Sequence, residues 1–467
     1  ARWRGEVLMC GAPRRARVEN ILFIVQPAII LARKRKKRQD TMMYLLNARD
    51  ADFLPRLDKA LIRGSSHEPT IIGIVSSIIE AVRQEGDTAL KRYTQQFDRH
   101  TGDLKISRAA LEQAAALCPV PVREALEKAA ARISAFHALQ HPDDKETIDS
   151  LGVRSGWRWE ALGAVGLYVP GGRASYPSSV LMNALPAKIA GVERLVVTVP
   201  TPEGYLSPAV AAALLLSNVD EVYAVGGAQA IAALAFGTTS IAPVVKIVGP
   251  GNAYVAEAKR QVFGKVGIDS IAGPSEVCII SDASTPAAWL AADLLAQAEH
   301  DPDAQSIIIA TDHGHLQAVV DAVAAQLPLL ATRAVAQASW DRHGLAILVP
   351  SLADAIPVAA RIAPEHLELS GPKAEALFPQ VRCAGSIFLG AHTPEALGDY
   401  CAGPNHVLPT SGAARYASGL GVTDFMRRAT FLHCPAGKAF AALAGIAIPL
   451  AEAEGLPGHG GSVGVRG

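Results

Sequence analysis

The sequence has few aromatic residues and few cysteines, and each shortage excludes a class of protein. Aromatics make up 5% of the 467 residues, so the core must be built mainly from Ala, Val, Ile and Leu. The six cysteines lie far apart and form no CxxC pair. This excludes a zinc ribbon and a thioredoxin motif, and it fits a reducing compartment such as the cytoplasm.

The chain also lacks net charge, but the zero is the sum of two unlike parts. Residues 1–42 hold 11 Lys and Arg against 3 Asp and Glu, whereas the remaining 425 residues hold 33 against 41. The body is therefore mildly acidic and has no electrostatic footprint for nucleic acid. We expect no nucleic-acid partner.

A long hydrophobic run is absent as well. The apolar segment 21–32 has about 12 residues where a bilayer needs about 20, and Pro27 interrupts it. The basic block RKRKKR follows this run, whereas a signal peptide carries its charges in front. We predict no membrane partner and expect residues 1–42 to be a disordered extension, with a natural start at Met42-Met43.

Periodicity predicts a helical stretch followed by alternating strands and helices. Apolar residues at three- and four-residue spacing predict helices over 71–86 and 123–139, within a helical arm or cap from about 48 to 140. Beyond residue 160, short buried-strand runs alternate with helical segments such as 207–219, 228–236, 252–263 and 315–327. The predicted strands are Leu195–Val199, Glu221–Val225, Val244–Val248, Glu276–Ile280, Ser306–Ala310, Leu345–Val349 and Ser386–Leu389. This order indicates two successive α/β units with parallel sheets.

Polar residues are expected at the carboxyl ends of these strands, where open α/β sheets bind ligands. Gln297 and His300 end a helix predicted over 285–300, with Thr285 as its N-cap. Their three-residue spacing puts both on one face, where they could hold one ion. The alternative is a polar last turn with His300 placed against the helix dipole.

Glu365 and His366 are adjacent, and Pro364 before them predicts that they lie at a helix beginning. Carboxylate and imidazole, with ordinary pKa values of about 4.3 and 6.5, suit general base chemistry near neutral pH. For an isolated dipeptide, surface decoration is the alternative reading.

Further candidates occur in Gly- and Pro-rich loops. Asp399 and His406 lie in one such loop, and Glu454 and His459 flank EGLPGH near the end of the chain. Glycine turns after Tyr168, Val225 and Val248 could present backbone N–H groups to a phosphate. A fourth turn contains Ser275, either a substrate donor or a turn residue, and no GxSxG elbow surrounds it.

Taken together, these blocks closely resemble histidinol dehydrogenase over roughly residues 43–467. The matching segments include YVPGGRASYPSSVLMNALPAKIAGV (168–192), VGPGNAYVAEAKRQVFG (248–264), DLLAQAEHDPDAQ (293–305), APEHLEL (363–369), GDYCAGPNHVLPTSGAARYASGL (398–420) and EGLPGH (454–459). The resemblance implies two NAD-dependent oxidations of L-histidinol to L-histidine through histidinaldehyde, with one zinc ion per subunit. It also implies an intertwined homodimer in which a partner's tail completes each site.

The resemblance assigns roles to the candidate residues. Glu365 and His366 would be the acid/base pair. The zinc ligands would be Gln297, His300, Asp399 and His459. Substrate contacts would be Ser275, Gln297, His300, His366, Asp399, His406, Glu454 and His459. NAD contacts would be Tyr168, Gln229 and Asn252.

The implied fold is α/β, with two incomplete Rossmann-like parallel-sheet domains and smaller helical N-terminal and C-terminal segments. The expected divisions are an extension (1–42), a helical segment (43–150), a first α/β domain (151–270), a second (271–395), and an active-site loop with a dimerisation tail (396–467).

Three other functions compete with this one. A relative with the same scaffold could oxidise another alcohol, such as a sulfonated diol. A zinc-dependent hydrolase would need only the metal and Glu365, without a nicotinamide site. A binding protein without catalysis would need no acid/base pair. Glu454, His459 and His406 are all present, which favours histidinol.

Overall fold

The computed structural model describes residues 45–63, 69–171 and 176–467. The chain divides into a unit of residues 1–45, of which only Leu45 is described, and a unit of residues 46–467. The predictions for residues 1–42 therefore lie outside the described residues. Within the described ranges, no helix combines the length and the apolar character that crossing a bilayer requires.

The first parallel sheet has the strand order β6-β5-β4-β7-β8. Its strands are β4 (Ala164–Tyr168), β5 (Arg194–Thr198), β6 (Glu221–Tyr223), β7 (Lys246–Val248) and β8 (Gly267–Ile268). The crossover helices are α7 (Pro177–Ile189), α8 (Pro208–Leu216), α9 (Gly227–Phe236) and α10 (Ala253–Val262), with the short helix η2 (Pro202–Gly204). The predicted strand–helix alternation is confirmed, with element ends shifted by a few residues.

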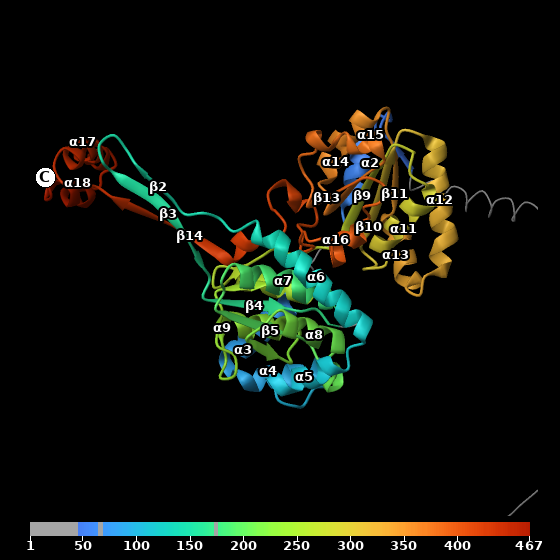
Figure 1. Cartoon of the computed structure of the whole chain (residues 1–467), viewed down its shortest axis with the longest axis horizontal. Coiled ribbons are helices and arrows are strands. Elements are labelled where there is room, and N and C mark those ends of the chain that lie inside the picture. Colours follow the sequence, from blue (N-terminus) through green and yellow to red (C-terminus); the bar gives the residue numbers. More distant parts are fainter. Residues whose placement is uncertain (1–44, 64–68, 172–175) are drawn as a thin grey trace, which may run out of the picture. The chain divides into compact units, whose positions relative to one another are not determined.

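The helices before this sheet pack on its crossover helices and do not form a separate arm. They are α3 (Pro69–Glu85), α4 (Asp87–Asp98), α5 (Arg108–Ala116) and α6 (Val120–Ala138). Helices α3 and α4 contact α9, while α5 and α6 contact α7 and α8 (Figure 1). Two hydrophobic cores result, one on each face of the first sheet, and both are built almost wholly from Ala, Val, Leu and Ile.

The second sheet has the order β1-β11-β10-β9-β12-β13, and its pairs from β9 to β13 are parallel. Its strands are β1 (Leu45–Asn47), β9 (Glu276–Ser281), β10 (Gln305–Ala310), β11 (Leu345–Leu348), β12 (His366–Ser370) and β13 (Ser386–Leu389). The helices are α2 (Phe53–Leu61), α11 (Ala287–Ala298), α12 (His313–Gln326), α13 (Arg333–His343), α14 (Leu352–Ile362), α15 (Pro372–Glu375) and α16 (Glu395–Tyr400), with η3 (Leu327–Leu329) and η4 (Phe378–Gln380). The prediction of Ser386–Leu389 as a strand of this sheet is confirmed.

The start of α11 corrects one prediction. The helix begins at Ala287 with Pro286 at the N-cap position, so Thr285 is not the N-cap. The Thr285 hydroxyl instead lies 2.9 Å from Ser370 Oγ, buried at the end of β12. Proline at the cap position leaves no side-chain acceptor there.

A third, antiparallel sheet is absent from the sequence predictions. It consists of β2 (Lys145–Ile148), β3 (Arg154–Ala161) and β14 (Met426–His433) in the order β14-β3-β2. None of the residues of β2 is buried, and β3 is at most partly buried, so neither strand shows the apolar pattern by which strands are recognised.

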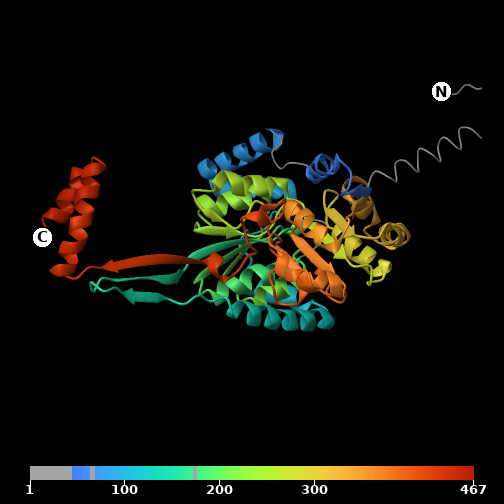
Figure 2. The same ribbon diagram turned by 90° about the horizontal axis from the view of Figure 1, so that it is seen from above.

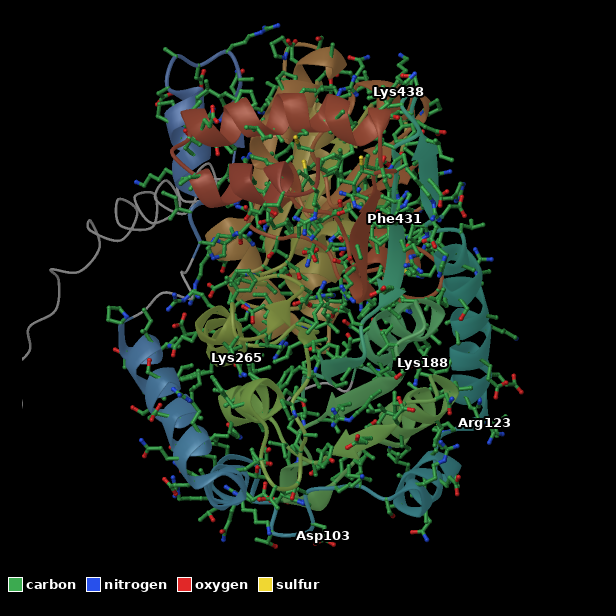
Figure 3. All side chains as sticks on the ribbon, turned by 90° about the vertical axis from the view of Figure 1, so that its left-hand side faces the viewer. Asp103, Arg123, Lys188, Lys265, Phe431 and Lys438 are labelled. Carbon is green, nitrogen blue, oxygen red and sulfur yellow. The ribbon has the colours of Figure 1, made fainter. Side chains whose placement is uncertain are left out.

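The chain ends in two helices beyond this sheet, α17 (Lys438–Ala453) and α18 (Pro457–Gly464), which pack against each other (Figures 1 and 2). Figure 3 places Phe431 on β14 and Lys438 at the start of α17. The short helices η5 (Ala413–Arg415) and η6 (Val422–Phe425) precede β14. Helices α17 and α18 form the predicted helical C-terminal segment, and β14, which the sequence did not predict, leads into it.

Candidate functional site

The acid/base candidates lie at the amino edge of the second sheet. His366 is the first residue of β12, and Glu276 is the first residue of β9. Helices α11 and α16 each follow a strand and return toward this edge, so Gln297 and Asp399 near their ends lie there too. The predicted location at the carboxyl ends is therefore wrong for the second sheet. The C-terminal ends of helices and the N-terminal ends of strands meet at this edge, and both contribute residues to the candidate site.

Glu365 and His366 begin a strand and not a helix, which corrects a second prediction. Helix α14 ends at Ile362, and Ala363 follows in the left-handed region with φ 49°. The chain then enters β12, whose register pairs His366 with Val277 and with Ser386. Both side chains are consequently buried, with 5% and 3% of their surfaces exposed.

The contacts of His366 determine which of its nitrogens can accept a proton. Nδ1 lies 3.0 Å from the carbonyl oxygen of Glu276. Because a carbonyl only accepts hydrogen bonds, Nδ1 carries the hydrogen and Nε2 is the basic atom of the neutral ring. Nε2 lies 3.5 Å from Asp399 Oδ1.

The electrostatics of the pair suit proton transfer near neutral pH. Burial raises the pKa of Glu365 to about 7, although the charge of His366 and the N–H of Glu276 oppose the rise. Burial by itself would lower the pKa of His366, but the carboxylates of Glu365, Glu395 and Asp399 raise it well above its ordinary value. Glu365 can therefore exchange a proton near neutral pH, whereas the protonated ring of His366 is favoured until the charges of the neighbouring carboxylates are compensated.

Two of the predicted cation ligands, Gln297 and Asp399, lie beside this pair, and His300 is exposed just after the end of α11. Gln297 is fully buried. When its amide group is oriented so that the nitrogen faces acceptors, that nitrogen donates to the Glu276 carbonyl (3.3 Å) and to Glu395 Oε2 (3.2 Å). Both amide hydrogens are then used, which leaves the amide oxygen for a cation. Burial opposes the shift, but the hydrogen bond to His366 and the charges of His366, His406 and His300 lower the pKa of Asp399.

His406 connects this edge to the first sheet. Its Nδ1 lies 2.8 Å from the Asp399 carbonyl, and its Nε2 lies 3.4 Å from Ser179 Oγ on α7. Burial lowers the pKa of His406, so the ring is neutral near pH 7. Ser275 lies just before β9, and its carbonyl accepts from the Gln305 N–H at 3.0 Å.

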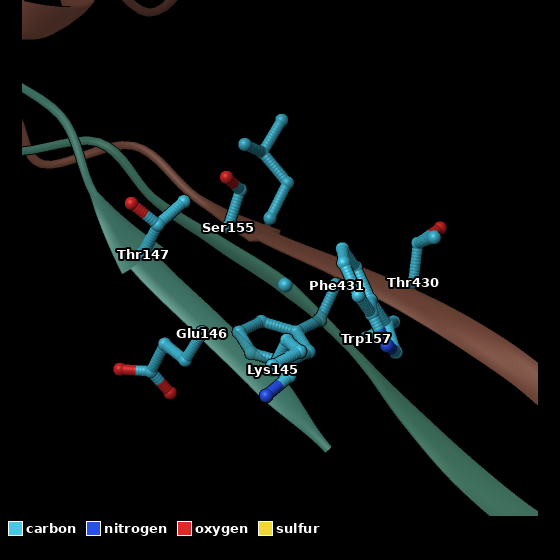
Figure 4. Close-up of a pocket in the computed structure, with 9 residues that line it drawn as sticks. Lys145, Glu146, Thr147, Ser155, Trp157, Thr430 and Phe431 are labelled. Carbon is cyan, nitrogen blue, oxygen red and sulfur yellow. The ribbon is translucent and has the colours of Figure 1, made fainter. Parts of the chain in front are cut away.

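Glu454 and His459 lie apart from this cluster. They line one hollow of about 650 Å³ between α17 and α18. Within the described ranges, no group of three or more His, Cys, Asp or Glu side chains is arranged to hold a metal. A second hollow, of about 600 Å³, lies on the antiparallel sheet around Trp157 and Phe431 and contains none of the candidate residues (Figure 4).

The predicted NAD residues lie at the carboxyl edge of the first sheet, where the prediction about strand ends is correct. Tyr168 ends β4, and its hydroxyl accepts from the Gly227 N–H at 3.2 Å, while burial raises its pKa to about 12. Gln229 is 1% exposed, and its Oε1 has no hydrogen-bond partner in the part of the chain that the structure describes. Asn252 caps α10 with its side-chain oxygen, which leaves its amide hydrogens for a ligand.

A buried ion pair shapes the turn before Asn252. Asp269 Oδ2 accepts from the Gly249 N–H at 2.8 Å, and Lys259 Nζ donates to the Gly249 carbonyl at 3.0 Å and pairs with Asp269. Gly249 has φ 110°, and a Cβ there would lie 2.2 Å from the Tyr168 carbonyl oxygen. Only glycine fits this close approach between β4 and β7.

Several residues of the site escaped sequence analysis. Glu276, Glu368 and Glu395 are at most 4% exposed and lie around His366. Burial raises the pKa of Glu368 to about 8 and that of Glu395 well above its ordinary value. A charged residue inside the apolar strand HLELS is a signal that could have identified Glu368. No comparable pattern marks Glu395, which follows a proline at a helix start.

Comparisons with known proteins show which family the chain resembles. The sequence profile of the family described as histidinol dehydrogenase matches residues 61–467. "Histidinol dehydrogenase 1" of Trichormus variabilis is 52% identical over 425 residues, covering 91% of this chain and 98% of that protein. Histidinol dehydrogenase of Rhodospirillum rubrum is 53% identical, covering 90% and 98%. The crystal structure of histidinol dehydrogenase from Elizabethkingia anophelis has a TM-score of 0.86 at 34% identity, covering 91% and 98%.

The raised pKa of Glu365 makes stability depend on pH. Its folded pKa of about 7 exceeds the ordinary 4.5, so the folded state binds more protons between these values. The contribution of Glu365 to the free energy of unfolding therefore falls as the pH rises through this window. We expect Glu365→Gln, which stays neutral, to become more stable relative to the wild type from pH 4.5 to pH 7, measured by urea denaturation. A pH-independent difference, or the same trend in the exposed Glu375→Gln control, would contradict this.

Proposed function

The chain belongs to the histidinol dehydrogenase family and is an oxidoreductase, and we propose that it converts L-histidinol to L-histidine in two NAD-dependent steps through histidinaldehyde. The observation that carries this proposal is the buried Glu365–His366 pair beside Asp399 at the amino edge of the second sheet. The two NAD-dependent steps need one base for an alcohol and one for water, and this pair can supply both.

His366 serves the first oxidation. In the neutral form of the ring, Nε2 takes the proton of the alcohol hydroxyl while a hydride passes from the hydroxyl-bearing carbon to NAD, which yields the aldehyde, NADH and one proton. The Nδ1 bond to the Glu276 carbonyl at 3.0 Å keeps the ring in the tautomer that this step requires. His406 and Ser275 are proposed to hold the substrate nearby.

Glu365 serves the second oxidation. With a pKa of about 7 its carboxylate can take a proton from water at neutral pH, so that the oxygen adds to the aldehyde carbon. The hydrate then loses a hydride to a second NAD, which yields the carboxylate, NADH and two protons. NAD is proposed to bind along Tyr168, Gln229 and Asn252, at the carboxyl edge where parallel sheets accept dinucleotides.

The donor set fits a zinc ion. Gln297, His300 and Asp399 offer an amide oxygen, an imidazole nitrogen and a carboxylate oxygen, and the hydrogen bonds of the Gln297 amide leave its oxygen free. We propose that these three residues and a His459 hold one Zn²⁺ per subunit. When bound, the ion anchors and orients the imidazole and amine of the substrate.

A homodimer would supply the missing residues. Glu454 and His459 lie on the terminal helices, apart from the other ligands. The same helices expose Ile446, Leu450 and Val465 to 61%, 59% and 81%. We propose that two copies intertwine so that the tail of one completes the site of the other. The proposed architecture is two incomplete Rossmann-like domains with the boundaries given above, in a cytoplasmic enzyme without nucleic-acid or membrane partners.

An NADH assay tests the function directly. Purified protein incubated with L-histidinol and excess NAD should form about two NADH for each histidinol consumed, as the two-step oxidation requires. A zinc hydrolase would form no NADH, and a diol dehydrogenase would leave histidinol unchanged. Either of these results would refute the proposal.

Replacing Glu365 should separate the two steps. Glu365→Gln removes the base for water and leaves His366 in place, so we expect alcohol oxidation to stay within about threefold of wild type. Aldehyde oxidation should fall by roughly 10²–10⁴-fold, the usual worth of a general base. Stopped assays that start from histidinol or from histidinaldehyde measure the steps separately. Equal losses in both would contradict this division, and the exposed Glu375→Gln serves as the control.

Replacing His300 should reduce the bound metal. We expect His300→Asn to lower zinc from about one ion per subunit to well below that, because one of four proposed donors is lost. Elemental analysis of dialysed protein gives the stoichiometry. His313→Asn, an exposed histidine at the start of α12, is the matched control. Unchanged zinc in the His300 variant would count against the ligand set.

A further inference from the structure

A buried arginine supports the amino edge of the second sheet from outside it. Arg63 follows α2, and only 4% of its side chain is exposed. Its Nη1 donates to the carbonyl oxygens of Pro274 and Ser275, both at 3.1 Å, and of Asp303 at 3.3 Å. Its Nη2 pairs with the carboxylate of Glu276. One guanidinium thus joins the segment after α2 to the turn that leads into β9.

Glu276 connects this arginine to both members of the acid/base pair. Its backbone N–H donates to Glu365 Oε2 at 3.0 Å, and its own Oε2 accepts from the backbone N–H of Glu365 at 3.3 Å. Its carbonyl accepts from His366 Nδ1 at 3.0 Å. Its Oε1 also accepts from the Ser411 N–H at 2.8 Å. The position of Glu365 therefore depends on where Glu276 lies.

The two catalytic side chains depend on Glu276 to different degrees. His366 belongs to β12, whose ladder with β9 and β13 fixes its backbone whatever the Glu276 side chain does. Glu365 lies at the start of the ladder, where its carbonyl accepts from the Ser386 N–H at 2.8 Å, but its own N–H is bound by the Glu276 carboxylate. If the Glu276 carboxylate moves, we therefore expect Glu365 to be displaced more than His366.

The Glu276 carboxylate in turn needs a cation. It is 4% exposed, and an unpaired buried carboxylate costs several kcal/mol or becomes protonated. Arg63 is the group that pairs with it among the ion pairs of the described residues. A lysine could supply the charge, but its single nitrogen cannot occupy both the place of Nη1, which binds the three carbonyl oxygens, and the place of Nη2, which pairs with Glu276.

We propose that Arg63 is a positioning residue for aldehyde oxidation, which acts through Glu276 to hold the Glu365 carboxylate where water is activated. This inference rests on the proposed function. A displacement of about 1 Å at a reacting group can cost on the order of 10²-fold in rate. Since His366 keeps its ladder, the effect falls on the second oxidation.

Arg194 provides a matched control. Its Nε pairs with Glu221 Oε1 at 2.6 Å, and its guanidinium also donates to the carbonyl oxygens of Pro243 (3.2 Å) and Ala242 (3.1 Å). It has the same chemistry as Arg63 but belongs to the first sheet. Arg194→Met thus removes an arginine, a carboxylate pair and backbone contacts without touching Glu365.

The test compares, in each variant, the rate of histidinaldehyde oxidation with the rate at which the first NADH forms from histidinol in a single turnover, which reports alcohol oxidation alone. In Arg63→Met we expect the aldehyde-to-alcohol ratio to fall by roughly 10–100-fold, with partial recovery in Arg63→Lys. In Arg194→Met the ratio should equal that of the wild type, even if the folded fraction drops. A purely structural role for Arg63 would lower both steps together and leave the ratio unchanged, which would overturn the proposal.

Two further outcomes are decisive. If Arg63→Met does not fold, Arg63→Lys decides: a ratio at least about threefold below wild type supports positioning, and a wild-type ratio overturns it. If the wild type itself forms no NADH from histidinol, the proposed function fails instead. The two failures are therefore distinguishable.

Discussion

The structure depends on the burial of a charged cluster at the amino edge of the second sheet. Glu276, Glu365, Glu368 and Glu395 are nearly inaccessible to water, with His366 among them. Burying an ion costs several kcal/mol unless it is paired and hydrogen-bonded. Their ionisation is therefore governed by mutual charges and by a few donors such as the Glu276 N–H. This constraint gives Glu365 a pKa of about 7, where an exposed carboxyl would already be ionised.

The two parallel sheets contribute opposite edges. The first uses its carboxyl edge, where the glycine turns after β4, β6 and β7 lie, and the second uses its amino edge. The loop from Asp399 to His406 links them, because the His406 ring lies near Ser179 on α7. Hydride transfer needs a cofactor and a base close to the same carbon, and this linkage is how the proposed reaction would bring them together.

Apolar patterns in the sequence predicted the strands whose side chains are buried and missed the strands whose side chains are exposed. The strands β5, β9 and β10 are fully buried or nearly so, and their positions were predicted to within a residue or two. In the antiparallel sheet, β14 pairs with β3 from a segment some 270 residues away, and its exposed residues carry no apolar alternation. Residue spacing likewise could not show that Glu365 leads into a strand that begins at His366. That path depends on the left-handed conformation of Ala363 after α14, which the tertiary contacts determine.

The sequence by itself determined the family, the α/β alternation, and the identities of the groups able to move a proton or hold a cation. These depend on residue type and local order, which are read directly from the chain. The tertiary structure alone decided which sheet edge the groups occupy, which nitrogen of His366 is basic, and that Arg63 and Glu276 support Glu365. Those features arise from contacts between residues as far apart as 63 and 276, and no local pattern encodes such contacts.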